Sequence, residues 1–185
     1  MTPDPRDQAI ANAVAQVVAV ERVEGWRPTD EQVSALAALA RGDGPFNDYL
    51  AKFRDRYPAP QTPRRRRLAL RPALPYLVPG TALLRNNFGA ASAEMLADLE
   101  FVATAGRMVL WLCGPTGRVD ADVLDVRVLH RHVFADVYAW AGEYRTCELR
   151  RGQQGFVWQS TLASRMTRVH DAARSVVDAG GGCCR

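Results

Sequence analysis

The stretch LHRHVFADVYAWAGEYRT, residues 129–146, decides how this chain is interpreted, because it brings histidines, carboxylates, aromatic rings and arginines together. His130 and His132 stand two positions apart, so on a helix their side chains point about 200° from each other and cannot share a metal ion. The apolar residues recur at the spacing of a helix rather than of a strand. They are Leu129, Val133, Val137 and Trp140. We therefore predict a packed helix here, and no metal site.

Each histidine has a structural interpretation on such a helix. His130 lies four residues before Phe134 on the apolar flank, which indicates a core histidine with satisfied hydrogen bonds. His132 lies four residues before Asp136, so we expect it to hydrogen-bond to that carboxylate. A catalytic role is the alternative interpretation for either histidine.

The composition is typical of a globular protein, with 48% apolar and 24% charged residues in a chain of 185. That length allows one ordinary domain or two small ones. No apolar run approaches the roughly 20 residues of a membrane-spanning helix. The start MTPDPRDQ is acidic and proline-rich, unlike a signal peptide. We expect a cytoplasmic protein that does not contact membranes.

Basic residues and cysteines suggest two further kinds of site. The run Arg64–Arg67 could neutralise phosphates of a nucleic acid, in a chain whose net charge is +4. Prolines surround the run, so a solvated linker over residues 58–75 is the favoured interpretation. The cysteines lack C-x-x-C spacing, so we expect reduced structural thiols and no metal. They are Cys113, Cys147, Cys183 and Cys184.

Helical periodicity and end signals predict three helices before the linker. They span about residues 7–24, 29–42 and 45–57. Gly25 stops the first helix. Thr29 and Gln32 can cap the second reciprocally, in a capping box. Residues 1–57 are thus expected to form a compact three-helix unit.

The second half of the chain is also mainly helical. Ser92 caps a long helix that Gly114 breaks, and a further helix is expected over 122–142. Extended residues around a glycine turn predict a β-hairpin over 144–158, followed by an amphipathic helix. The tail at 180–185, ending in GGGCCR, has no functional interpretation.

Two stretches resemble the amino-terminal half of the Fic family of protein adenylyltransferases. They are YLVPGTALLRNNFGA (76–90) and LHRHVFADVYAWAGEYRTCELRRG (129–152), with the pattern H-x-x-x-F-x-D-x-Y-x-W-A-G-x-x-R-T. The resemblance covers about 80 residues, from Tyr76 to Trp158. It implies a Fic-like helical bundle over 76–179.

The resemblance also assigns roles to individual residues. It makes part of the pattern structural, namely His130, Phe134, Asp136, Trp140, Gly142 and Arg145. It makes the hairpin a flap that docks the target protein by strand-like pairing. The flap residues are Thr146, Cys147, Glu148, Leu149 and Phe156.

The chemistry of the Fic family belongs to a later motif, H-x-F-x-[DE]-G-N-G-R-x-x-R. Its histidine takes a proton from the target hydroxyl, and its Gly-Asn-Gly backbone binds the ATP phosphates. Its acidic residue holds Mg²⁺. This motif is absent from the 185 residues, so no catalytic residue is assigned. We expect that the chain is truncated before the motif and is inactive. Intact family members use ATP and Mg²⁺, and we expect this chain to bind neither.

The segment AVERVEGW (19–26) resembles the inhibitory helix of a VbhA-type antitoxin, whose motif is [ST]-x-x-x-E-[GN]. Glu24 and Gly25 match the motif, whereas Val20 occupies the position of the Ser or Thr. In the family the glutamate pairs with the last arginine of the catalytic motif and misplaces ATP. The alternative is a solvated glutamate without a partner.

Together these features predict a mainly α protein in which an antitoxin-like unit precedes the first part of a Fic domain. Intact relatives would transfer AMP from ATP to Ser, Thr or Tyr hydroxyls of a target protein, and whether this chain is itself an enzyme stays open. One alternative is a non-catalytic interaction module, with residues 1–57 inhibiting an intact Fic partner or the flap holding a target. Nucleic-acid binding is the weaker alternative. Self-association is expected if the apolar faces of 95–112 and 126–141 are exposed.

Overall fold

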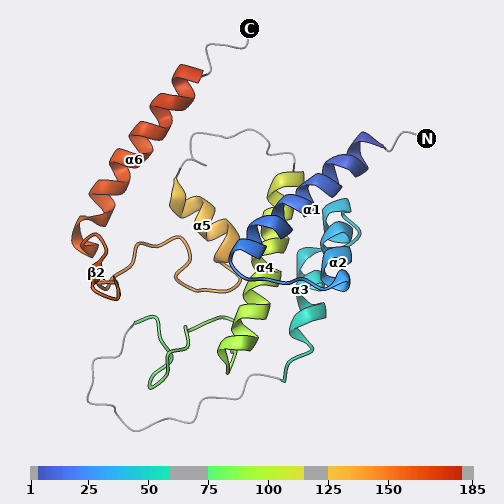
Figure 1. The fold of residues 1–185 in the computed structure, drawn as a ribbon, viewed down its shortest axis with the longest axis horizontal. Coiled ribbons are helices and arrows are strands. Elements are labelled where there is room, and N and C mark those ends of the chain that lie inside the picture. The colour runs from blue at the N-terminus through green and yellow to red at the C-terminus, as the bar shows by residue number, and fades with distance from the viewer. Residues whose placement is uncertain (1–3, 59–74, 115–124, 181–185) are drawn as a thin grey trace.

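The computed structural model describes residues 4–58, 75–114 and 125–180. Within these ranges the chain forms six helices and one two-stranded antiparallel hairpin (Figure 1). In chain order they are α1 (Pro5–Val23), α2 (Asp30–Arg41), α3 (Phe46–Arg54), α4 (Ala93–Cys113), α5 (Val126–Phe134), β1 (Arg150–Arg151), β2 (Gln154–Gly155) and α6 (Gln159–Gly180). The predicted mainly helical fold with a small hairpin is confirmed.

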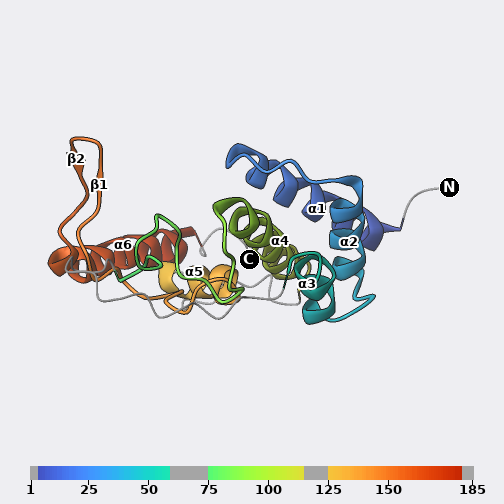
Figure 2. The ribbon, with the colours of Figure 1, turned by 90° about the horizontal axis from the view of Figure 1, so that it is seen from below.

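Helix α4 is the centre of the hydrophobic core, and α1, α2, α3 and α5 all pack against it (Figures 1 and 2). Leu99 and Val109 of α4 are completely buried. Gly106 allows α3 to approach closely, since a Cβ atom there would lie 2.7 Å from Cε1 of Tyr49. The Tyr49 hydroxyl donates a hydrogen bond to the Val102 carbonyl at 3.1 Å. The three N-terminal helices therefore share one core with α4.

The ends of the first two helices follow the local sequence signals. The Gln32 N–H donates to Thr29 Oγ1 at 3.2 Å, and the Thr29 N–H donates to Gln32 Oε1 at 2.8 Å. This reciprocal pair is the predicted capping box. Helix α1 ends just before Gly25, whose φ of +104° continues the chain in the left-handed region.

Helix α5 is shorter than the predicted helix over 122–142, which is therefore wrong in its length. Beyond α5, the Asn87 side-chain amide donates to the Ala135 carbonyl at 3.0 Å. The backbone N–H of Asn87 donates to the Val137 carbonyl at 2.8 Å. These carbonyls thus bond to a distant loop, and residues 135–142 are not helical.

Two other predicted boundaries also differ. Helix α3 ends at Arg54 rather than near Tyr57. The hairpin pairs only two residues on each strand, with Arg150 opposite Gly155, although the extended region was expected over 144–158. The Arg64–Arg67 run, most of the linker, the expected helix start at Asp122, and Cys183 and Cys184 lie outside the described residues.

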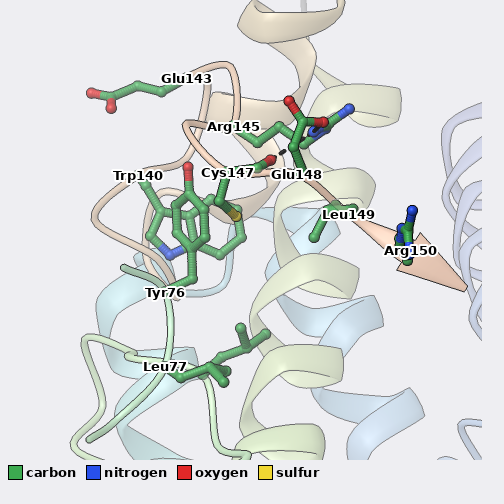
Figure 3. Close-up of a pocket in the computed structure, with 10 residues that line it drawn as sticks. Tyr76, Leu77, Trp140, Glu143, Arg145, Cys147, Glu148, Leu149 and Arg150 are labelled. Carbon is green, nitrogen blue, oxygen red and sulfur yellow. Dashed lines mark hydrogen bonds and ion pairs between the residues drawn. The ribbon is translucent and has the colours of Figure 1, made fainter. Parts of the chain in front are cut away.

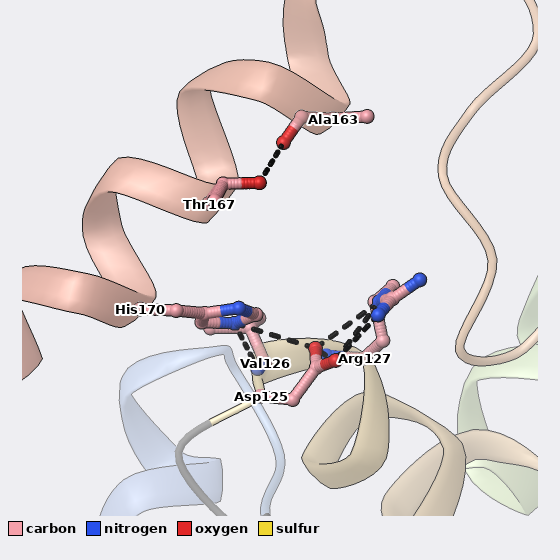
Figure 4. Close-up of polar contacts among 6 residues, drawn as sticks. All are labelled: Asp125, Val126, Arg127, Ala163, Thr167 and His170. Atoms are coloured by element: carbon pink, nitrogen blue, oxygen red, sulfur yellow. Dashed lines mark hydrogen bonds and ion pairs between the residues drawn. The ribbon is translucent and has the colours of Figure 1, made fainter. Parts of the chain in front are cut away.

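The hairpin and α6 lie to one side of the core (Figures 1 and 2). His170 of α6 approaches the start of α5, where its Nε2 lies 3.3 Å from both the Val126 N–H and Asp125 Oδ1 (Figure 4). Asp125 also pairs with the Arg127 guanidinium at 2.6 Å, which lowers the pKa of Asp125 to about 2. In the part of the chain that the structure describes, no helix has the length and apolar character needed to cross a membrane.

Candidate functional site

An open groove, the α1–α5 groove, runs between the C-terminal half of α1 and helix α5, with α4 as its floor. It consists of two adjoining cavities of about 620 and 630 Å³. Both are lined by Val20, Met108, Leu129 and Val133. Val20 is 57% exposed and Leu129 is 37% exposed, so apolar side chains face solvent along the groove. The expected exposure is therefore met only in part: Val126 and Leu129 of α5 face solvent, whereas the apolar face expected to be exposed over 95–112 is mostly buried against the N-terminal helices.

Glu24 stands at the acidic end of the groove, directly after the last residue of α1. Its side chain is exposed and makes no hydrogen bond or ion pair with another residue in the described ranges. The turn that follows is fixed, because Trp26 is buried and its ring stacks on Phe101 with centroids 6.1 Å apart. A carboxylate at the C-terminal end of a helix faces the negative end of the macrodipole, an arrangement that only a nearby cation would favour.

Two further carboxylates lie beside Glu24. Glu21 is only 6% exposed and accepts a hydrogen bond from the Thr104 hydroxyl at 2.8 Å. Glu100 accepts one from the Tyr138 hydroxyl at 2.8 Å. Burial raises the pKa of Glu21 and of Glu100, and each hydroxyl partly offsets that effect. Among the described residues no lysine or arginine lines this cavity, so its electrostatics suit a cation.

The sequence analysis did not identify Glu21 as part of the site. The signal was present, because Glu21 follows Val17 and Val18 at the i+4 and i+3 positions of the buried face of α1. A carboxylate on the buried apolar face of a helix requires a hydrogen-bond donor from another element. Thr104, the donor, is 83 positions away in the sequence, so its identity could not be predicted.

His130 of the Fic-like pattern lies inside a cluster of rings. Its Nδ1 accepts a hydrogen bond from the Gly142 N–H at 2.9 Å. The imidazole centroid lies 4.8 Å from that of Phe134 and 5.9 Å from that of Trp140. Burial lowers the pKa of His130, which favours the neutral ring that this hydrogen bond requires. His130 is thus held in the middle of α5 by ring packing and by the bond from Gly142.

Asp136 forms a two-pronged ion pair with Arg107 of α4. The Arg107 Nε lies 2.6 Å from Oδ2 of Asp136, and its Nη2 lies 2.9 Å from Oδ1. The guanidinium also lies over the Phe46 ring, 3.9 Å from its centroid. The predicted hydrogen bond between His132 and Asp136 is wrong, since His132 Nε2 instead lies 3.2 Å from the Arg107 carbonyl oxygen. A bidentate guanidinium is the stronger partner for this carboxylate.

Trp140 and Arg145 connect the end of the pattern to the flap. The Trp140 ring packs edge-on against Tyr76, with centroids 5.2 Å apart. The Arg145 guanidinium donates to the carbonyls of Cys147, at 2.6 Å, and of Val157. These two carbonyls precede and follow the hairpin, so Arg145 fixes its base.

Of the five flap residues, two are held by hydrogen bonds, one is half-buried and two are exposed. The Thr146 N–H donates to the Tyr76 hydroxyl at 2.7 Å, and Glu148 accepts from the Gln159 N–H at the start of α6 at 3.0 Å. Cys147 is half-buried, whereas Leu149 and Phe156 are 46% and 57% exposed.

A pocket of about 350 Å³ opens between the flap and the loop that begins at Tyr76 (Figure 3). We call it the flap pocket. Its apolar wall consists of Tyr76, Leu77, Leu84, Trp140, Cys147 and Leu149. Charged side chains stand at its rim.

No group of three or more histidine, cysteine or acidic residues that could hold a metal occurs in the described ranges. The α1–α5 groove does not fit ATP either. Three carboxylates would face the triphosphate, and no basic side chain in the described part of the lining would balance it.

Comparisons with known proteins found similarity to three that are named as adenylyltransferases. The chain is 32% identical over 82 residues to the probable protein adenylyltransferase Fic of Salmonella typhimurium, covering 44% of this chain and 40% of that protein. It is 33% identical over 95 residues to the probable protein adenylyltransferase y4lH of Sinorhizobium fredii, covering 51% and 47%. The Fic protein of Escherichia coli is 29% identical over 82 residues, with the same coverage as the Salmonella protein.

No protein-family model and no solved structure matches the chain. The chain covers less than half the length of each of the three relatives. Over about half its own length, this mainly helical protein is therefore similar to proteins named as probable adenylyltransferases of the Fic type.

Proposed function

We propose that this chain is the amino-terminal part of a Fic-type protein adenylyltransferase that carries its inhibitory helix, α1, in the same chain. The observation that carries the proposal is the position of Glu24 at the edge of a groove. Three carboxylates line this groove, and no lysine or arginine occurs among its described lining residues. The groove lies between α1 and α5, and α5 carries the first part of the Fic-like pattern. Similarity to three probable adenylyltransferases supports the assignment.

In the intact enzyme, AMP would pass from ATP to a Ser, Thr or Tyr hydroxyl of a target protein, with Mg²⁺ bound near the phosphates. The sequence contains no H-x-F-x-[DE]-G-N-G-R-x-x-R motif, and the groove offers a phosphate three carboxylates and no basic side chain among its described lining residues. The base, the phosphate nest and the metal ligand would all come from that motif. We therefore propose that the 185 residues alone do not catalyse transfer, and that their roles are to dock the target and inhibit.

The proposed inhibition depends on how α1 is anchored. Val20 occupies the Ser or Thr position of the antitoxin motif and cannot donate a hydrogen bond. The bond from Thr104 to Glu21, in the same helical turn, supplies an equivalent attachment to α4. Glu24 is then positioned one turn further on, where an arginine of the catalytic motif could form a charge-assisted pair with it.

Inhibition within one chain fits better than inhibition of a separate partner. Val17 of α1 and Leu36 of α2 are almost completely buried in the core they share with α4. To act on another Fic protein, residues 1–57 would have to leave that core and expose these side chains to water. The interaction-module alternative is therefore strongest for the flap. Nucleic-acid binding through Arg64–Arg67 remains a proposal outside the described residues.

The test requires a fusion of this chain to a catalytic half that carries the missing motif, and labelled ATP with Mg²⁺. Glu24→Gly should raise AMP transfer by about ten- to a hundredfold, because it removes a charge-assisted pair of about 1.5–3 kcal/mol. Val23→Gly is the matched control, since Val23 is 84% exposed and adjacent in the same turn. Equal rates for the two variants would refute inhibition by Glu24.

The unfused chain provides the second arm of the test. It should transfer no label above a control without protein. Transfer that disappears in a His130→Ala variant would instead make His130 catalytic and would overturn the structural role proposed for it.

A further inference from the structure

Helix α6 carries an apolar face that is open to solvent. Val169 is 50% exposed and Val176 is 71% exposed. Apart from the His170 side chain at the start of α5, α6 packs against no other helix or strand among the described residues. Contiguous exposed apolar surface is typical of an interaction site. This face of α6 is therefore available to a partner.

Arginine side chains continue the same face toward the N-terminal end of α6. At about 100° per residue, Val169 and Val176 lie within about 40° of Arg165 around the helix axis. Arg165 and Arg168 are exposed, and neither forms an ion pair with another residue in the described ranges. The open face of α6 is thus basic near its N-terminal end and apolar beyond it.

The α1–α5 groove carries the complementary pattern. Three carboxylates line its end near Glu24, where the described lining includes no basic side chain, and mainly apolar side chains line its end near Gln16. Along α1, Gln16 and Glu24 are about 12 Å apart, and along α6, Arg165 and Val176 are about 16 Å apart. A helix that lies antiparallel to α1 in this groove would therefore place Arg165 beside Glu24 and its valines on the apolar part.

The helix that fits this groove belongs to a second molecule. Figures 1 and 2 both show α5 between α6 and α1, so α6 lies on the far side of α5 from the groove of its own chain. In a dimer with two-fold symmetry, each α6 would lie in the groove of the other molecule, and the same contact would form twice. Both apolar surfaces would then be covered.

We propose that the α1–α5 groove binds helix α6 of a second copy of this chain, in a symmetric dimer in which Arg165 pairs with Glu24. The proposal goes beyond the proposed function, because it concerns the unfused chain and requires neither ATP nor a catalytic motif. A failure of the enzyme fusion would leave it intact. A monomeric chain would equally leave AMP transfer by the fusion unaffected.

Cross-linking by a carbodiimide identifies the contact directly, because this reagent joins a carboxylate to a nearby amine. Lys52 is the single lysine of the chain, so Arg165→Lys keeps the charge and adds one reactive amine on α6. Isotopically labelled and unlabelled samples of this variant are mixed under reducing conditions before the reagent is added. Mass spectrometry should find residue 165 of one isotopic form joined to Glu24 of the other.

An exchange of charges tests the energetic role of the pair. Arg165→Glu and Glu24→Arg should each raise the dissociation constant of the dimer at least about tenfold in sedimentation velocity, because each places like charges together at both contacts. The double variant should restore most of the affinity. Arg174→Glu is the matched control, since Arg174 lies nine residues after Arg165 and about 180° around the helix. It should change the dissociation constant by less than about threefold.

Three results would overturn the proposal. A parent protein that stays monomeric would exclude the dimer. Cross-links confined to one isotopic form would show that α6 reaches the groove of its own chain. Cross-links between residue 165 and Asp171 of the other molecule, without rescue in the double variant, would show that α6 pairs with α6. Circular dichroism verifies that the charge variants are folded, and the cross-linking experiment needs none of them.

Discussion

Replacement of Thr104 by Val is the sharpest test of how α1 is held in place. Valine has nearly the shape of threonine but lacks the hydroxyl that lies 2.8 Å from the Glu21 carboxylate. Because Glu21 is 6% exposed, its carboxylate would lose a donor that water cannot fully replace. Hydrogen bonds to charged groups are worth about 1.5–3 kcal/mol, so the free energy of unfolding should fall by about that amount near pH 7.5. Urea unfolding at low protein concentration measures the change.

The effect should depend on pH in a defined direction. Burial raises the pKa of Glu21, and the Thr104 hydroxyl lowers it, so the variant should have the higher folded-state pKa. A folded-state pKa above the unfolded one means that Glu21 opposes folding at neutral pH, and that this opposition is relieved as pH falls. The difference between Thr104→Val and the parent protein should therefore shrink towards about pH 4, where Glu21 is protonated in both.

The controls separate this bond from other roles of the hydroxyl. Thr104 Oγ1 has one proton, yet it also lies 2.9 Å from the Glu100 carbonyl and 3.2 Å from the Phe101 carbonyl. Thr104→Ser keeps the hydroxyl and should cost much less. A double-mutant cycle with Glu21→Gln should give a coupling energy of the same order as the single loss. A pH-independent loss, or no coupling to Glu21, would show that the proton goes to a helix carbonyl and that α1 is anchored elsewhere.

Three further perturbations test other parts of the structure. Asp136→Asn should lower the free energy of unfolding by about 1–3 kcal/mol in thermal or urea unfolding, because it breaks the half-buried pair with Arg107; no loss would contradict that role. Leu129→Glu should reduce the self-association measured by sedimentation velocity, because it adds a charge to the apolar part of the α1–α5 groove. A parent protein that is already monomeric would contradict association through this groove. Gly142→Ala should lower the free energy of unfolding by about 1–3 kcal/mol, because φ at Gly142 is +83° and a Cβ there would lie 2.7 Å from the nearest atom. The control is Gly152→Ala, whose Cβ would meet no atom within 4 Å and which should cost less in the same assay.

Local signals predicted the parts of the fold that depend on neighbouring residues. The capping box at Thr29 and the glycine at the end of α1 both act within one turn, so their chemistry is visible in the sequence. The mainly helical class followed from periodicity, and the hairpin from a glycine turn between extended residues. In these cases the determining contact spans only a few positions.

The features that were predicted wrongly depend on distant residues. Just after the end of α5, the Ala135 carbonyl accepts a hydrogen bond from Asn87, which lies 48 positions away in the sequence. Asp136 pairs with Arg107 rather than His132, across 29 positions. Spacing on one helix identified which side chains were close, but it could not show which partner another helix would supply.

The shared core has a consequence for how the two parts of the chain depend on each other. Val17, Leu36 and Phe53, from α1, α2 and α3, are buried against α4, which lies beyond the 58–75 segment. A protein cut once between residues 58 and 75 should therefore remain assembled as two fragments. Each fragment alone would expose an apolar surface that only the other covers. The two halves thus behave as complementary pieces of one folding unit, and α1 cannot be released by cutting the chain there.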